Sequence, residues 1–253
     1  MTAAAVICAP AWQPAPRSPL ALADGEVHVW RVPLAPPPEQ LAAFARTLRP
    51  DERERAARFV FERDRTAYTS ARGALRTLTG AYLGRAPEEL ELGYHDKGKP
   101  YLASPPGEPL RFNVSHSGEL ALIAFVRDRE LGVDIERRRD TLDLVSLART
   151  AFSPHEYRTL CGLPPDDHPI AFFSCWSRKE AFIKATGEGV SQLEDFDVSL
   201  RPDEPARLLR VPGPPPGHAR WSILDLPAIP GYAAALVVAG DGLRIACWDW
   251  PPA

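Results

Sequence analysis

The continuous run Phe172–Lys184 constrains this chain most, because it contains neither glycine nor proline. It is long enough for three helical turns, and Gly187 follows where a helix of this length would end. At 100° per residue, the residues that fall on one side are Phe173, Trp176, Glu180 and Ile183, with Lys184 at the edge. The run therefore predicts a helix that carries a carboxylate on its core-facing side.

Burying an unpaired carboxylate is costly, so Glu180 should meet a cation there. One interpretation is a partly exposed ion pair with Lys184, one turn later, which would stabilise the helix by only about 0.2–0.5 kcal/mol. The other interpretation places Glu180 in a cation-binding site built with other parts of the chain. The remaining motifs favour the second.

Composition and charge narrow the class of protein. The 253 residues, of which 45% are apolar and 25% charged, suit one large globular domain or two small ones. A net charge of −3 argues against nucleic acid or an anionic membrane as a partner, and no segment reaches the roughly 20 apolar residues of a membrane span. The four scattered cysteines and the lack of a signal-peptide pattern predict reduced thiols and a cytoplasmic location.

The first part of the chain predicts a tail, a strand and then helices. Residues 1–24 are rich in alanine and proline, which is typical of a flexible tail. The alternating stretch 26–32 predicts the first strand, and helical patterning begins at Glu39.

Residues 51–82 predict two or more helices rich in arginine, and Pro50 suits a first helical turn. A solvated basic face is the ordinary interpretation of such a run. Phosphate binding by a subset, which includes Arg55 and Arg72, is the alternative.

Two polar motifs lie on predicted strands. Residues 112–118 predict a β-hairpin with Ser115 and His116 at its turn, where hydroxyls, backbone N–H groups and an imidazole could bind an anion. In the strand 131–136, Asp134 and Glu136 are two residues apart and share a face. Two such carboxylates repel each other unless a cation lies between them, and a half-exposed edge strand is the simpler alternative.

The order of elements, helices followed by a strand meander, occurs twice. We therefore expect an α+β fold of two pseudo-symmetric halves, residues 25–131 and 132–253, each with helices packed on a small and mainly antiparallel sheet. The boundary falls beside Asp134 and Glu136, and ligand sites are favoured between domains.

Together, Asp134, Glu136 and Glu180 form a set of oxygen ligands without a histidine or cysteine cluster, which suits Mg²⁺ or Mn²⁺. Lysine, arginine and histidine nearby fit phosphoryl chemistry. The residues by themselves therefore predict a metal-dependent enzyme that acts on a phosphate or diphosphate ester.

The motifs carry a resemblance that goes further. Gly132–Glu136 (GVDIE) and Trp176–Lys184 (WSRKEAFIK) resemble the signature pair of the Sfp-type 4′-phosphopantetheinyl transferases. Gly98-Lys99-Pro100 and residues 112–118 (FNVSHSG) are similar to two further motifs of that family, in the expected order. The resemblance, over roughly residues 49–240, implies a usually monomeric protein that binds coenzyme A between its halves. It implies transfer of 4′-phosphopantetheine from CoA to a serine of an apo acyl or peptidyl carrier protein, with release of 3′,5′-ADP.

The resemblance also implies residue roles. Asp134, Glu136 and Glu180 would hold Mg²⁺, or alternatively Mn²⁺, against the CoA diphosphate. Glu180 would also deprotonate the carrier serine, and Lys184 would steady the diphosphate and protonate the leaving group. His116, a third catalytic candidate, would bind the diphosphate or the 3′-phosphate together with Ser115.

Lys99 would bind the nucleotide phosphates. Where the family often has a lysine for the 3′-phosphate, this chain has Glu52, so Arg53, Arg55 or Arg72 is expected to replace it. An Mg²⁺-dependent hydrolase of a small diphosphate such as CoA would use the same carboxylates and is the alternative function.

Overall fold

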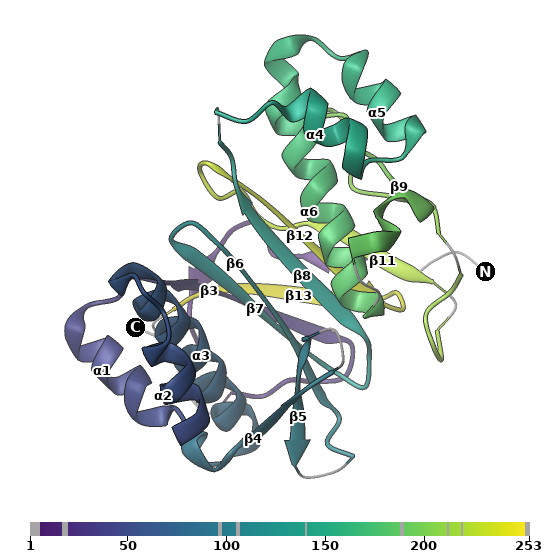
Figure 1. Ribbon diagram of the computed structural model, residues 1–253. Helices are drawn as coiled ribbons and strands as arrows, with labels where there is room; N and C mark the ends of the chain where they lie inside the picture. Colours follow the sequence, from purple (N-terminus) through teal and green to yellow (C-terminus); the bar gives the residue numbers. More distant parts are fainter. Residues whose placement is uncertain are drawn as a thin grey trace.

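The computed structural model describes residues 6–16, 20–95, 98–104, 107–139, 141–187, 190–211, 213–218 and 220–250. The strands form two main sheets, and the helices lie in two groups at opposite ends of the molecule (Figure 1). The α-helices are α1 (Pro38–Thr47), α2 (Pro50–Ala57), α3 (Glu62–Leu83), α4 (Leu144–Ala151), α5 (Pro154–Cys161) and α6 (His168–Thr186). This arrangement is the α+β architecture that the sequence predicts.

The larger sheet has six strands in the order β1-β13-β3-β7-β6, with β2 also paired to β13. These strands are β1 (Ile7–Cys8), β2 (Gln13–Pro14), β3 (Glu26–Pro33), β6 (Leu110–Ser117), β7 (Leu120–Arg127) and β13 (Arg244–Asp249). The second sheet runs β11 (Trp221–Asp225), β12 (Tyr232–Ala239), β8 (Leu131–Arg137), with both pairs antiparallel. Two small hairpins complete the fold: β4 (Glu91–Tyr94) with β5 (Pro100–Ser104), and β9 (Asp197–Val198) with β10 (Leu208–Arg210).

Local patterns predict most elements of the first half correctly. The strand expected at 26–32 is β3, and the helices expected from Glu39 and from Pro50 are α1 and α2. Residues 69–76 of helix α3 are all buried, and Leu75 packs in a cluster with Trp30 and Phe125 of the first sheet.

The expectation of a flexible tail over residues 1–24 is wrong for the part of that segment that the structure describes. Strands β1 and β2 pair in parallel with β13, and the side chains of Ala15 and Leu22 are buried. Composition suggested disorder, but a partner strand from the far end of the chain supplies the missing backbone hydrogen bonds.

Strand β13 also departs from the expected division of the chain at residue 132. It pairs with β3 over residues 244–249, so the C-terminal segment belongs to the first sheet. A domain boundary between residues 131 and 132 therefore does not assign each strand to its own sheet.

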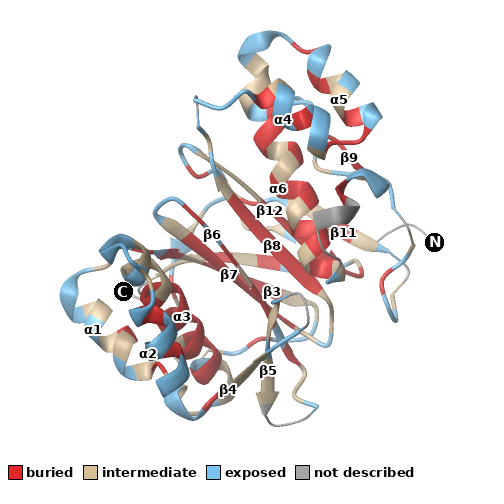
Figure 2. Ribbon diagram, viewed as in Figure 1, coloured by how far each residue is buried: buried red, intermediate tan, exposed pale blue. Residues whose placement is uncertain are grey.

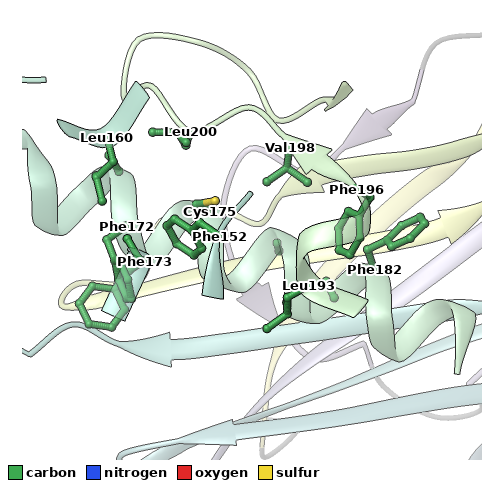
Figure 3. Close-up of a cluster of buried hydrophobic side chains, with 14 of the residues drawn as sticks. Phe152, Leu160, Phe172, Phe173, Cys175, Phe182, Leu193, Phe196, Val198 and Leu200 are labelled. Atoms are coloured by element: carbon green, nitrogen blue, oxygen red, sulfur yellow. The ribbon is translucent and has the colours of Figure 1, made fainter. Parts of the chain in front are cut away.

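Helix α6 confirms the helix expected at 172–184, and Gly187 ends it in the left-handed region with φ of 73°. The expected one-sided burial is wrong, because Trp176 and Glu180 of the predicted side are only half-buried, whereas Phe172, Cys175 and Phe182 elsewhere on the helix are buried. Figure 2 shows buried residues along much of α6. Figure 3 shows Phe172, Cys175 and Phe182 within a cluster that also draws on α5 and the residues around β9. The helix is covered on two sides, by the second sheet and by these elements.

A close backbone contact fixes where α6 crosses the second sheet. A Cβ atom at Gly132 of β8 would lie 2.1 Å from the Ala181 carbonyl oxygen and 2.4 Å from the Ala185 amide nitrogen. Only glycine leaves room for this approach. The contact brings the last turns of α6, with Glu180 and Lys184, next to the acidic residues of β8.

Helix α6 is also anchored by a buried ion pair. Ser153 begins α5 with the capping box that the sequence predicts, and Glu156 completes it by accepting from the Ser153 amide at 2.9 Å. The same Glu156 carboxylate accepts from Lys179 Nζ at 2.8 Å and from the Val198 amide at 2.8 Å. Lys179 and Glu156 are both 0% exposed.

Among the helices in the described part of the chain, none is long and apolar enough to span a membrane.

We expect Lys179→Met to lower the free energy of unfolding by about 3–5 kcal/mol, because it leaves Glu156 buried without a cation. Urea denaturation measures the change. The double variant Lys179→Met/Glu156→Gln is the control, since it removes both charges and should be more stable than the single variant. Equal stability of both variants would show that the buried charge is not the cause.

Candidate active site

A cavity of about 880 Å³ lies between the β4–β5 hairpin, the end of α6 and the proline-rich loop before β11. Its walls include Tyr94, Lys99, Tyr101, Thr186 and Trp221. Aromatic rings and a lysine thus border an opening beside the end of α6.

Asp134 lies at the centre of the acidic cluster. It is 2% exposed on β8, and its Oδ1 accepts from Lys184 Nζ at 2.6 Å and from Ser115 Oγ at 2.8 Å. Its other oxygen, Oδ2, is buried and has no hydrogen-bond partner among the described residues. A buried carboxylate oxygen without a donor is costly, which marks this atom as a place for a ligand.

Glu136 shares a strand face with Asp134, as the period of two predicts. Its Oε2 accepts from Ser117 Oγ at 2.8 Å. Burial raises the pKa of the Glu136 carboxyl, the negative charge of Asp134 raises it further, and the bond from Ser117 opposes the shift.

Glu180 approaches the same two carboxylates from α6. Burial is the main reason that the pKa of the Glu180 carboxyl is raised; Lys184 opposes this shift, and Asp134 and Glu136 add to it. The expected alternative of a Glu180–Lys184 surface pair is not what the structure shows, since the ion pair of Lys184 is with Asp134. The three carboxylates therefore influence one another, with the single ammonium of Lys184 among them.

The fit of this set to a divalent cation can be tested on its own atoms. In the described ranges, no three acidic, histidine or cysteine side chains already converge closely enough to hold a metal. Three carboxylates nevertheless share the one ammonium of Lys184, and the Oδ2 of Asp134 has no hydrogen-bond partner among the described residues. Oxygen donors of this kind suit a hard cation such as Mg²⁺.

Ser115 and His116 lie within strand β6, and the turn follows at Gly118, so the expected turn position is wrong. The two side chains consequently point to opposite faces. Ser115 is buried against Asp134, while His116 is exposed and lines a second cavity of about 470 Å³.

That second cavity also contains the arginines expected from the sequence. Arg55 and Arg72 lie in its wall, and both guanidinium groups sit over the ring of Tyr94, at 5.8 and 5.3 Å from its centroid. Tyr94 borders both cavities, so these cations stand beside the larger opening.

Glu52, the residue that departs from the family pattern, is 2% exposed. It forms ion pairs with Arg72 and with Arg76, whose Nε lies 2.6 Å from Glu52 Oε2. The ion pair holds the Arg72 side chain beside the cavity. The position of Glu52 in the sequence motif did not indicate this buried contact.

Lys99 faces the larger cavity, with its Nζ 3.3 Å from Glu130 Oε2 and 3.2 Å from the Leu131 carbonyl oxygen. Burial lowers the pKa of its ammonium, and Glu130 opposes this shift. Lys99 thus ties the β4–β5 hairpin to the start of β8.

Sequence reasoning missed several residues that shape the site. Arg178, two residues before Glu180, pairs with Asp225 and donates to the Ser199 carbonyl, and thereby holds α6 against β11. Asn113 and Ser117 of β6 bond to β8. The strict alternation of Asn113, Ser115 and Ser117 was a usable signal, because three polar residues on one strand face require a common partner.

The fold and the site define a two-sheet α+β protein that has a cluster of three carboxylates and, separately, basic residues in the walls of two cavities. Such groups suit an enzyme of phosphate-ester chemistry. Residues 33–127 match the N-terminal region of 4′-phosphopantetheinyl transferase, and residues 130–237 match the 4′-phosphopantetheinyl transferase superfamily. The chain is 42% identical over 240 residues to the 4′-phosphopantetheinyl transferase HetI of Nostoc sp., covering 94% of this chain and 98% of that one.

Two Bacillus subtilis proteins are also similar. One named 4′-phosphopantetheinyl transferase is 34% identical, with coverage of 79% of this chain and 87% of that one. The 4′-phosphopantetheinyl transferase Sfp is 29% identical, with coverage of 79% and 86%. This chain belongs to the 4′-phosphopantetheinyl transferase family. It is therefore an enzyme that transfers 4′-phosphopantetheine from coenzyme A to carrier proteins, and the comparisons give no support to a hydrolase.

The electrostatics of the acidic cluster predict a stability effect. A carboxyl with a raised pKa in the folded state binds its proton more tightly there, so it stabilises the fold at low pH and this contribution is lost as the pH rises through the folded pKa. We expect Glu180→Gln, in metal-free buffer at pH 7, to melt at a higher temperature than the unchanged protein, with the difference shrinking toward pH 4.

Glu88→Gln, at an exposed position, is the control and should leave the melting temperature unchanged. A lower melting temperature for Glu180→Gln at pH 7 would contradict the assignment of excess negative charge to this cluster.

Proposed function

We propose that Asp134, Glu136 and Glu180 together hold one divalent cation, Mg²⁺ or alternatively Mn²⁺, beside the CoA diphosphate. The single observation that carries the proposal is the buried and unpartnered Oδ2 of Asp134 next to two carboxyls with raised pKa values. A bound divalent ion would supply charge neutralisation at the diphosphate oxygens.

The nucleotide end of CoA fits the two adjoining cavities. We assign Arg55, Arg72 and His116, which share the smaller cavity, to the nucleotide phosphates, and Lys99 to the wall of the larger one. Paired guanidinium groups suit phosphate oxygens. The hydroxyl of Ser115 is bonded to Asp134 and to Lys184, and we propose that it acts through these two side chains.

The proposed reaction is an in-line phosphoryl transfer. Glu180 accepts the proton of the carrier serine hydroxyl, directly or through water, while the serine oxygen bonds to the phosphorus that carries pantetheine. The bond from that phosphorus to the bridging oxygen breaks, and Lys184 protonates the 3′,5′-ADP that leaves. A carboxyl whose pKa is raised by burial is a better base than an ordinary glutamate.

The acceptor is an apo acyl or peptidyl carrier protein. We further propose that the enzyme is a monomer, as the family resemblance implies, and that it is cytoplasmic, where its four cysteines would stay reduced as free thiols.

With CoA and Mg²⁺, an apo carrier should gain about 340 Da, the mass of one phosphopantetheinyl group. Intact mass spectrometry on a panel of acyl and peptidyl carriers measures the gain. EDTA should abolish it and added Mg²⁺ restore it. A panel whose masses all stay unchanged, or a full gain in EDTA, would count against the carrier assignment or the metal assignment respectively.

Glu180→Gln keeps size and hydrogen bonding but removes the base, so turnover should fall by about 10²-fold or more. Lys184→Ala should lose a similar part of the rate, and Lys184→Arg should recover it only partly, because a planar fork replaces a point charge. Steady-state kinetics with one carrier measures these changes. If Glu180 and Lys184 had no catalytic role, all three variants would keep nearly normal turnover. Normal turnover in Glu180→Gln would sink this mechanism.

A further inference from the structure

Strands β6 and β8 lie side by side at the site but belong to different sheets (Figure 1). One edge of β8 pairs with β12 through backbone hydrogen bonds. The opposite edge faces β6, and there the amide groups of every second residue of β8 need another acceptor.

Three side chains of β6 supply those acceptors. The Val133 amide donates to Asn113 Oδ1 at 2.9 Å. The next two bonds repeat the pattern two residues along each strand, from the Ile135 amide to Ser115 Oγ at 3.4 Å and from the Arg137 amide to Ser117 Oγ at 3.1 Å. Asn113, Ser115 and Ser117 thus form a polar seam between the sheets.

The hydroxyl of each serine in the seam also donates a hydrogen bond to a carboxylate. Ser115 donates to Asp134 Oδ1 and Ser117 donates to Glu136 Oε2, both at 2.8 Å. A hydroxyl can accept from an amide and donate to a carboxylate at once, which neither alanine nor valine can do. Each serine therefore binds the backbone of β8 and, one residue earlier, a carboxylate of the acidic cluster.

We propose that Asn113, Ser115 and Ser117 are positioning residues that set the register of β8 against β6 and fix which oxygens of Asp134 and Glu136 remain free for the cation. This inference rests on the metal site proposed above. A side chain inserted in every bond holds the two strands farther apart than the roughly 4.8 Å of directly paired strands. The hydroxyl that occupies Oδ1 of Asp134 leaves Oδ2 unpartnered, and the bond to Glu136 likewise engages one oxygen of two.

Burial makes the positioning strict. Asn113, Ser115 and Ser117 are 2%, 6% and 7% exposed, so water does not replace a lost hydroxyl at low cost. Ser115 additionally accepts from Lys184 Nζ at 2.8 Å, which couples it to a catalytic candidate. Ser117 contacts the cluster only through Glu136 and is the better residue for a test.

The test measures metal binding without turnover. Electron paramagnetic resonance of free Mn²⁺, with CoA present and no carrier, gives the Kd of the enzyme for the ion. We expect Ser117→Ala to raise this Kd by about 10-fold or more, as for other residues that orient a ligand. Ser117→Thr, which keeps the hydroxyl, should restore most of the affinity.

Ser222→Ala is the matched control. Ser222 is a strand serine of β11, 9% exposed, and its hydroxyl donates to the Gly240 carbonyl oxygen away from the cluster. It should lose comparable stability and keep the Kd for Mn²⁺. A Kd for Ser117→Ala within about twofold of the unchanged enzyme, or an equal rise in Ser222→Ala, would overturn the proposal.

A second readout is independent of the metal. Amide hydrogen exchange at Arg137 should accelerate in Ser117→Ala, and exchange at Val133 should accelerate in Asn113→Ala, while Ser222→Ala changes neither. Unchanged exchange rates in both variants would show that Asn113 and Ser117 do not protect the amides of β8. Should Ser117→Ala not fold, Ser117→Cys preserves the volume with a weaker donor, and the same two readouts apply to it.

The two proposals fail in different ways. If the unchanged enzyme does not bind Mn²⁺ in the presence of CoA, the metal site is wrong, and exchange at Arg137 and Val133 still decides whether the seam positions β8. If the unchanged enzyme binds Mn²⁺ and Ser117→Ala binds it equally well, the metal site stands and the positioning role is wrong.

Discussion

The site depends on the close approach of helix α6 to strand β8 at Gly132. Any Cβ atom at that position would overlap the backbone of Ala181 and Ala185, so a larger residue would push the helix away from the sheet. Glu180 and Lys184 sit on the same helical turns that make this contact. A backbone contact without side chains between is thus what allows a helix and a strand to contribute carboxylates to one cluster.

The buried carboxylates of this protein are of two kinds: those that are fully paired with cations and stabilise the fold, and those of the cluster around Asp134. Glu156 and Glu52 are each satisfied, the first by Lys179 and the second by Arg72 and Arg76. Such pairs anchor α6 and set the arginine beside the smaller cavity. Around Asp134, one ammonium serves three carboxylates, and an oxygen remains without a donor. A fold tolerates this excess where a ligand can relieve it.

Polar side chains also join the two sheets where continuous backbone pairing does not. Alternating Asn113, Ser115 and Ser117 turn the edge of β6 into a row of acceptors for β8. At the other side of the first sheet, β13 inserts between β1 and β3 and brings the end of the chain back to its beginning. The segments 25–131 and 132–253 are therefore joined through the bonds between β6 and β8 and also through β13 in the first sheet.

Elements and candidate residues with local signals could be predicted from the amino-acid sequence. The glycine-free run of α6, the alternation in β8 and the capping box at Ser153 each depend on neighbours within a few positions, so short-range patterns were sufficient to place them. The family resemblance added the expected roles of Glu180 and Lys184.

Which side chains meet at the site depends on how distant segments pack. Lys184 pairs with Asp134 and not with Glu180, Ser115 and His116 face opposite ways from within a strand, and β13 lies in the first sheet. Each of these facts depends on contacts between segments far apart in the chain. No local period encodes such a contact, because its free energy comes from burial and hydrogen bonds that exist only once both segments are in place.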